Sequence, residues 1–173
     1  MVQNGITSLE MSRSTHSTLS LELGRLKDPL VYAGEFRHAL DAKHRVTIPS
    51  RWRGAKKDAE FFAVPDPAGN FLMIMPPPEF DRVKSDVEAN PSISPADRRK
   101  FIRRFYAVAQ LVSVDRQGRV LLPEEYCRSL GLEGEVVLIG SHSRMEIWNS
   151  KRWAAATLEE DEVFRRVAGE VGL

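Results

Sequence analysis

Two stretches of the sequence decide the fold: DAKHRVTIP at residues 41–49 and DRQGRVLLP at residues 115–123. Both begin with Asp, carry Arg and Val at the fifth and sixth positions, and end with an aliphatic residue and Pro. Agreement in these positions at one fixed offset indicates an internal repeat. Because a solenoid needs roughly three or more units to bury a continuous core, two copies instead predict two half-domains that close on each other.

The similarity continues on both sides of the repeated phrase. Residues 35–40 align with 109–114, residues 61–64 align with 135–138, and, after a one-residue length difference, Ile74 aligns with Ile147 and Phe80 with Trp153. The alternation of apolar residues predicts the same order in each unit: strand, turn, strand, short helix, two strands and helix.

Proline, glycine and capping residues mark the expected elements. Ser94 followed by Asp97 is typical of a helix start, and Pro123 and Gly131 favour the first position and the end of a short helix. Phe101, Ile102 and Phe105 form an apolar stripe at helical spacing, so we expect the helix at 94–106 to dock with a solvated basic face. The predicted strands span 33–40, 45–48, 136–139 and 145–148, and the predicted helices span 79–89, 94–106 and 123–131.

Composition is typical of a small soluble regulator. The 173 residues suffice for one compact domain or two small ones, and 42% hydrophobic residues are enough for a core. The net charge is only +1, but residues 31–57 carry seven Lys and Arg against two acidic residues, a local charge of +5. Local charge of one sign attracts phosphate partners even when the total is near zero.

Cysteine use and hydropathy suggest the compartment. Cys127 is the only cysteine, which excludes an internal disulfide, and its place in the predicted helix at 123–131 favours a buried thiol. No segment approaches the roughly 18 apolar residues of a membrane span, and the N-terminus has no apolar signal core. We expect a cytoplasmic protein.

Residues 1–29 include a Ser- and Thr-rich stretch from Thr7 to Ser20 and are expected to form a disordered extension.

Each repeated phrase predicts a turn with basic side chains. In one interpretation the turn simply closes a hairpin. Asp and Arg then pair across it, and this exposed ion pair contributes little to stability. In the other, both turns lie at one end of a closed barrel, where guanidinium groups bind phosphate or guanine while Asp41 and Asp115 orient them. A pair of strands fits the major groove of DNA. The candidate DNA-binding residues are Arg45, Arg119, Lys43, Arg116, Arg37, Arg51 and Arg53.

The sequence offers little for catalysis. Its four histidines have no metal-ligand spacing with cysteine or with each other. It contains neither a Gly-x-Ser-x-Gly elbow nor a phosphate-binding glycine loop. We therefore predict no catalytic residues, no metal and no cofactor, and neither a membrane nor a small-molecule substrate as a partner.

The repeated Asp-x-Lys-(Gly)-Arg phrase, its aliphatic residues and Pro, and the helical linker between the copies resemble the bacterial MraZ family. Each half resembles an AbrB-type swapped-hairpin domain, and the resemblance covers about residues 31–165. One departure is His44, where the pattern prefers Gly and the second copy keeps Gly118. The resemblance implies an α+β fold with a swapped-hairpin β-barrel. It implies repeats at 32–90 and 107–165, a helical linker at 91–106 and a C-terminal tail at 166–173.

The same resemblance implies a function. MraZ-like proteins bind short direct repeats of double-stranded promoter DNA as ring-shaped homo-oligomers associated with the nucleoid. They often repress the division and cell-wall gene cluster, including their own gene. The alternative is an oligomeric interaction scaffold or antitoxin-like module, for which the acidic segment from Glu159 onward is the candidate partner-binding tail.

Overall fold

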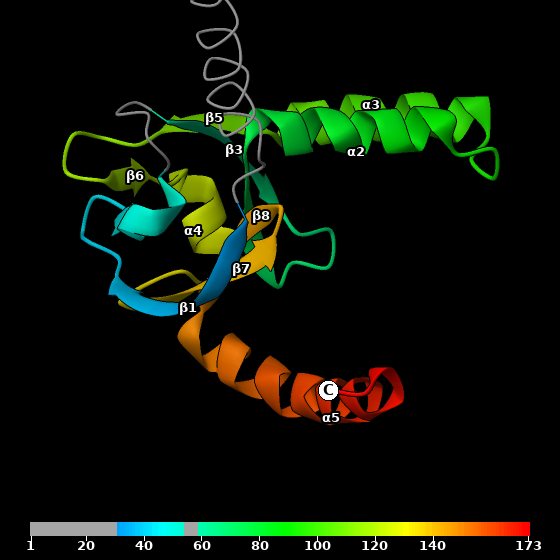
Figure 1. Cartoon of the computed structure of the whole chain (residues 1–173). Helices are drawn as coiled ribbons and strands as arrows, with labels where there is room; N and C mark the ends of the chain where they lie inside the picture. Colours follow the sequence, from blue (N-terminus) through cyan, green and yellow to red (C-terminus); the bar gives the residue numbers. More distant parts are fainter. Residues whose placement is uncertain (1–30, 54–58) are drawn as a thin grey trace, which may run out of the picture. The chain divides into compact units, whose positions relative to one another are not determined.

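The computed structural model describes residues 31–53 and 59–173, so the predicted extension at 1–29 lies outside the described residues. The fold is α+β, as expected, with antiparallel strands and helices that extend from them (Figure 1). The strands are β1 (Tyr32–Ala39), β2 (Arg45–Thr47), β3 (Glu60–Pro65), β4 (Phe71–Met75), β5 (Gln110–Ser113), β6 (Arg119–Leu121), β7 (Glu135–His142) and β8 (Arg144–Asn149). The helices are the 3-10 helix η1 (Ser50–Trp52), α2 (Pro77–Ala89), α3 (Pro95–Val108), α4 (Glu124–Leu130) and α5 (Ser150–Val171).

The larger sheet has a symmetric strand order, β1-β7-β8-β4-β3-β5. Equivalent strands of the two repeats stand at equal distances from its two edges: β1 and β5, β7 and β3, β8 and β4. The first strand of each repeat pairs with the other repeat, because β1 pairs with β7 and β5 pairs with β3. Neither repeat can therefore complete its hydrogen bonding alone.

The strands that flank each repeated turn pair only at its base, where the amides of Asp41 and Asp115 donate to the carbonyls of Arg45 and Arg119 at 3.0 and 2.7 Å, so the expected hairpin closes the turn but does not extend along the strands. Instead β2 and β6 form a separate two-stranded ribbon, with Val46 opposite Val120 at its centre. These two residues hold the same position in their repeats, so a pseudo-two-fold axis passes between them. We call this pair of strands the β2–β6 ribbon.

The strand registers correct one part of the repeat alignment. Phe62 pairs with Met75 in the first repeat, and Val137 pairs with Trp148 in the second. Since Met75 and Trp148 are equivalent, Phe62 matches Val137, and Phe61 matches Val136 rather than Glu135. The shift preserves burial: Phe61 and Val136 are buried, whereas Glu60 and Glu135 are exposed.

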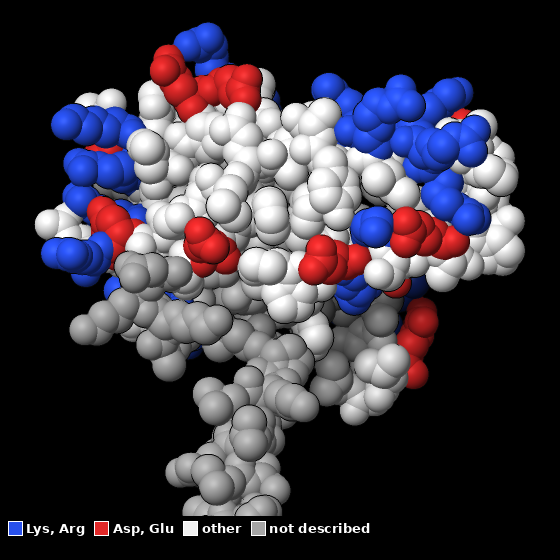
Figure 2. All heavy atoms as spheres, turned by 90° about the horizontal axis from the view of Figure 1, so that it is seen from above, with Lys and Arg blue, Asp and Glu red and all other residues white. Residues whose placement is uncertain are grey.

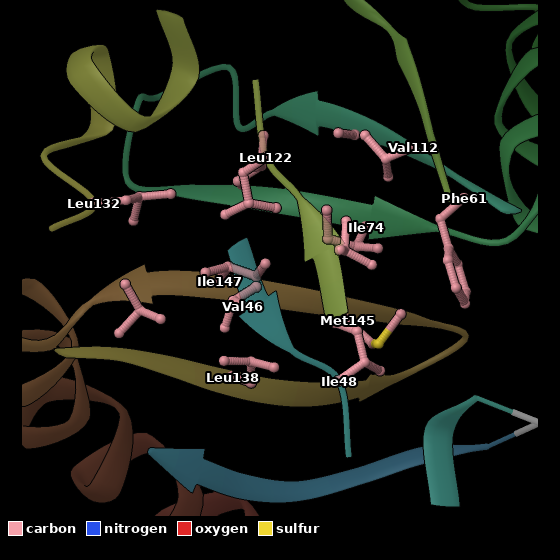
Figure 3. Close-up of a cluster of buried hydrophobic side chains, with 14 of the residues drawn as sticks. Val46, Ile48, Phe61, Ile74, Val112, Leu122, Leu132, Leu138, Met145 and Ile147 are labelled. Atoms are coloured by element: carbon pink, nitrogen blue, oxygen red, sulfur yellow. The ribbon is translucent and has the colours of Figure 1, made fainter. Parts of the chain in front are cut away.

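The main core lies between the β2–β6 ribbon and the sheet. Figure 3 shows Val46 and Ile48 from the ribbon side pointing toward Leu138, Met145 and Ile147 of the sheet. Trp52 is buried in the same cluster and meets Phe36 edge-on with ring centroids 5.0 Å apart. Cys127 is buried too, and this burial raises the pKa of its thiol to about 11. An inert structural thiol follows.

Most helix boundaries match the capping signals. The Ser94 hydroxyl accepts a hydrogen bond from the Asp97 amide, and Gly131 ends α4 in the left-handed conformation, both as predicted. Pro123 precedes α4 instead of occupying its first position. The connection between the predicted strands 136–139 and 145–148 is shorter than expected. Strand β7 continues to His142 and β8 begins at Arg144. Helix α5 runs through the predicted boundary between residues 165 and 166 and ends at Val171. The bounds of the repeats, linker and tail stay predictions.

Helices α2 and α3 form a second, smaller core with the sheet. Phe80 of α2 stacks on Phe105 of α3 with ring centroids 4.7 Å apart, and both side chains are buried. The expected docking of α3 is thus confirmed through Phe105, whereas Phe101 is half exposed.

Candidate nucleic-acid interface

The first turn, residues 41–45, is organised by the carboxylate of Asp41. Its Oδ1 accepts hydrogen bonds from the backbone amides of Lys43 and Arg45, both at 2.9 Å. Its Oδ2 accepts from Nε of Arg45 at 2.7 Å. One side chain therefore shapes the turn and fixes the base of the guanidinium group. His44 adopts φ 58°, a left-handed conformation that His tolerates better than most residues.

The second turn, residues 115–119, repeats this geometry. Asp115 Oδ1 accepts from the amides of Gln117 and Arg119 at 2.8 and 2.9 Å. Its Oδ2 accepts from Nε and Nη2 of Arg119 at 3.0 and 2.9 Å. Gly118 takes φ 79° at the position equivalent to His44. The predicted pairing of each Asp with its Arg is confirmed in both turns.

These hydrogen bonds favour the ionised carboxylates. The backbone amide of Arg45 is the main cause that holds the pKa of Asp41 below its ordinary value, and the Arg45 side chain adds to it. The amide and side chain of Arg119 lower the pKa of Asp115 in the same way. Both carboxylates are therefore charged at neutral pH, and both arginines keep a charge-assisted partner.

Two cross-bonds tie the turns to each other. The Ile48 amide donates to the carbonyl of Gly118 at 2.9 Å, and the Leu122 amide donates to the carbonyl of His44 at 2.8 Å. Each bond runs from the end of one repeated phrase to the turn of the other. The turns are thus fixed at the two ends of the β2–β6 ribbon, on the side away from the α2–α3 pair (Figure 1).

The β2–β6 ribbon has one buried and one outward face. Val46 and Val120 are fully buried. Alternation along a strand, with Arg45 opposite Leu121 and Thr47 opposite Arg119, places these four residues on the other face. The side chains of Arg45 and Arg119 are 33% and 26% exposed. Thr47 and Leu121 are not among the predicted residues, although their spacing of two from the arginines signals the shared face.

The other candidate cations differ in their surroundings. Lys43 and Arg116 are exposed on the turns, and neither pairs with an acidic side chain in residues 31–53 and 59–173. Arg51 lies over the ring of Phe36, 5.0 Å from its centroid. Arg37 lies on β1 between Glu35 and Glu135, at 3.2 and 3.1 Å, so its charge is locally neutralised. The structure therefore brings Lys43 and Arg116 to the turns and separates Arg37 from them.

A second basic area lies on α3, away from the turns. Figure 2 shows Lys and Arg gathered over this helix and, separately, at the opposite end of the molecule. Arg98 of this helix does not contribute to the expected solvated basic face, because it donates to the carbonyls of Asn90 and Ile93 at 2.9 and 3.2 Å. Arg98 therefore joins α2 to α3, and the remaining basic residues of α3 form its exposed side.

The described residues were also expected to hold neither a metal ion nor a membrane span. Within residues 31–53 and 59–173, no cluster of three or more His, Cys, Asp or Glu side chains has the arrangement of a metal site. The helices of the same residues are too short or too polar to span a bilayer.

Known proteins resemble this chain over most of its length. A protein-family profile described as "MraZ protein, putative antitoxin-like" matches residues 105–168. A "Transcriptional regulator MraZ" of Desulforamulus reducens is 32% identical over 82% of this chain and 97% of its own length. Relatives of the same name from Heliobacterium modesticaldum and Thermomicrobium roseum are 36% and 38% identical, over 80% and 72% of this chain and 94% and 86% of their own lengths. The resemblance carried by the two repeated phrases is thus confirmed, and the chain belongs to the MraZ family.

Proposed function

We propose that this chain is a transcriptional regulator that binds DNA through the outward face of the β2–β6 ribbon. One observation carries the proposal: Arg45 and Arg119 share this face, and each is anchored at Nε by an aspartate of its own turn. In the part of the chain that the structure describes, Nη1 and Nη2 of Arg45 have no partner. A guanidinium group with a free edge binds guanine O6 and N7 or a phosphate bidentately.

The dimensions of the ribbon support this use. A two-stranded ribbon enters the major groove of B-DNA, which is about 12 Å wide. Lys43 and Arg116 extend from its two ends, where they would meet phosphates that flank the groove. Thr47 and Leu121 between the arginines supply a hydroxyl and an apolar contact for base edges.

The pairing of each first strand with the other repeat also supports a finer description of the fold. We propose that the two repeats form the AbrB-like swapped-hairpin barrel implied by the sequence. In this arrangement the β2–β6 ribbon closes one side of the barrel. A substitution that separates the repeats would then remove the DNA-binding face together with the core.

We also propose the regulatory role that the family resemblance implies. The chain would repress the promoter of the division and cell-wall gene cluster, including its own gene, by binding short direct repeats as a ring-shaped homo-oligomer in the nucleoid. A single ribbon makes few contacts, so simultaneous binding by linked subunits would raise affinity by roughly 10²–10⁴. Helix α5 supports self-association, because its Val163, Phe164, Val167 and Val171 are exposed.

The same helix favours a second candidate, an interaction scaffold or antitoxin-like module. Exposed apolar patches mark protein-binding surfaces, and α5 adds the acidic run 159–162 beside its apolar residues. In this case the basic turns would bind protein instead of DNA.

The decisive test is binding to a labelled duplex from the region upstream of the protein's own gene, with a scrambled duplex of equal length as control. Fluorescence anisotropy at several salt concentrations should show tighter binding to the upstream duplex and a linear fall of log affinity with log salt concentration. Equal affinity for both duplexes would contradict sequence-specific regulation.

A further inference from the structure

The two turns differ in what covers them. A Cβ atom placed on Gly118 would lie 3.0 Å from Nε of Arg53 and closer still to its Cζ and Nη1. The guanidinium group of Arg53 therefore occupies the space that a side chain at position 118 would need. Because Arg53 follows η1 in the first repeat, one repeat supplies a cation to the turn of the other.

Among the described residues, Arg53 is held on the second turn by packing and not by an ion pair. Its Nε is buried and has no hydrogen-bond partner in the described residues. Its terminal nitrogens likewise have no carboxylate or carbonyl partner there. Gly118 is buried although it lies on a surface turn, since the guanidinium plane covers it. Arg53 therefore lies against Gly118, the residue before Arg119, and no acidic side chain within residues 31–53 and 59–173 forms an ion pair with it.

In the described part of the chain, no cation packs on the first turn in this way. Its fourth position is His44, and the matching region of the second repeat holds Cys127 and Arg128, which line a hollow beside His44. Arg128 is directed to Glu124, with Nη2 and Oε1 2.7 Å apart. The space that Arg53 fills at the second turn is therefore open at the first.

We propose that Arg53 binds a DNA backbone phosphate beside the second turn, so that the two turns contact DNA unequally. This inference rests on the proposed function. Beyond the exposed Lys43 and Arg116, the second turn binds with two positioned arginines, Arg53 and Arg119, whereas the first binds with one, Arg45. Two equal halves would match a two-fold symmetric site. Unequal halves give each subunit a defined direction along the duplex.

The first experiment compares Arg53→Gln with Arg128→Gln on the upstream duplex. Each phosphate contact adds about 0.9 to the slope of log affinity against log salt concentration. Loss of the Arg53 contact should lower this slope by about 0.9 for each engaged subunit. The affinity advantage of the wild type should then shrink roughly 3- to 4-fold between 50 and 200 mM salt. Arg128→Gln should leave slope and affinity unchanged, and equal melting temperatures exclude a folding effect.

The second experiment uses the residue that the first turn already carries. Gly118→His introduces the side chain that the first turn accepts at positive φ, but at position 118 it displaces the guanidinium group of Arg53. The variant should lose as much affinity as Arg53→Gln, and the double variant should lose no more than either single one.

The outcomes separate this inference from the proposed function. If the wild type prefers the upstream duplex and Arg53→Gln keeps the wild-type slope, the phosphate contact is wrong while DNA binding stands. Additive losses in the double variant would also overturn it, because Gly118 and Arg53 would then act independently. If the wild type does not distinguish the upstream duplex from the scrambled one, the proposed function itself fails.

Discussion

The carboxylate of Asp41 holds Arg45 at two places, since Oδ1 accepts from its backbone amide at 2.9 Å and Oδ2 accepts from its side-chain Nε at 2.7 Å. Asp115 holds Arg119 in the same way. The conformation of the turn and the direction of the guanidinium group are therefore set by one residue.

Replacing Asp41 with Asn separates these two roles. The amide oxygen can still accept from the backbone amides of Lys43 and Arg45, so the turn should persist. The amide nitrogen cannot accept from Nε, so the guanidinium group is released. We expect affinity for the upstream duplex to fall about 10-fold while affinity for scrambled DNA holds or rises, because one negative charge is gone. Parallel anisotropy titrations measure both, and an equal fall on both duplexes would contradict an orienting role.

Truncating the arginines tests direct contact. A bidentate guanine contact contributes roughly 1–3 kcal/mol, or about 5- to 150-fold in affinity. Arg45→Ala and Arg119→Ala should each lose specific binding by such a factor per subunit while circular dichroism stays unchanged. Arg45→Lys keeps the charge without the planar fork and should recover non-specific affinity only. Wild-type affinity in both alanine variants would exclude the contact.

Acid should destabilise the two turns. The pKa of each turn aspartate is lower in the folded chain than in the unfolded chain, where it is about 3.9. The stabilisation is therefore complete above about pH 3.9 and is lost as the pH falls through the folded pKa values. The melting temperature of the wild type should drop more steeply below about pH 4 than that of Asp41→Asn/Asp115→Asn. Parallel melting curves from pH 5 to 2 would contradict this linkage.

His44 at φ 58° offers a stabilising substitution. Glycine removes the left-handed strain of about 1–2 kcal/mol but makes the unfolded chain more flexible at a cost of about 0.5–1 kcal/mol. His44→Gly should therefore stabilise the fold by about 0–1.5 kcal/mol, measured by urea unfolding. Gly118→Ala is the opposite change in the equivalent position and should destabilise it. A clear loss of stability in His44→Gly would mean that the imidazole makes contacts that matter more than the strain.

Helix α5 tests the assembly. Phe164 and Val167 are adjacent on its surface and exposed, whereas Leu158, 75% exposed, lies on the other side of the helix from Val167. Phe164→Glu should reduce the molar mass measured by light scattering, because a charge would be buried at the contact. Leu158→Glu is the matched control and should leave the mass unchanged. A monomeric wild type at micromolar concentration would exclude the proposed ring.

Local features of the fold could be predicted from the sequence because each depends on a few neighbouring residues. Three such features join residues that are at most about five positions apart in the sequence. They are the cap at Ser94, the end of α4 at Gly131 and the Asp–Arg pair of each turn. The strand partners could not be predicted in this way. An alternating pattern shows which face of β1 is buried, but not that Tyr32 will pair with His142.

The candidate site could be predicted to the same extent. The repeated phrase predicts that Arg45 and Arg119 pair with the aspartates of their turns, because the turn geometry is encoded in the phrase itself. The position of Arg53 against Gly118 depends on how the two repeats fit together, and nothing in either residue's local sequence indicates it. The burial of Cys127 followed from its predicted helix, whereas the outward face shared by Thr47 and Leu121 required the register of the β2–β6 ribbon.

The pairing of β1 with β7 also has a consequence during protein synthesis. Strand β1 has no partner until most of the chain has been translated, which at about 5–20 residues per second takes several seconds or more. An unpaired strand invites aggregation unless it is polar. In β1, Glu35, Arg37 and His38 interrupt the apolar residues. The charged face of this strand therefore protects the nascent chain during the interval before its partner emerges from the ribosome.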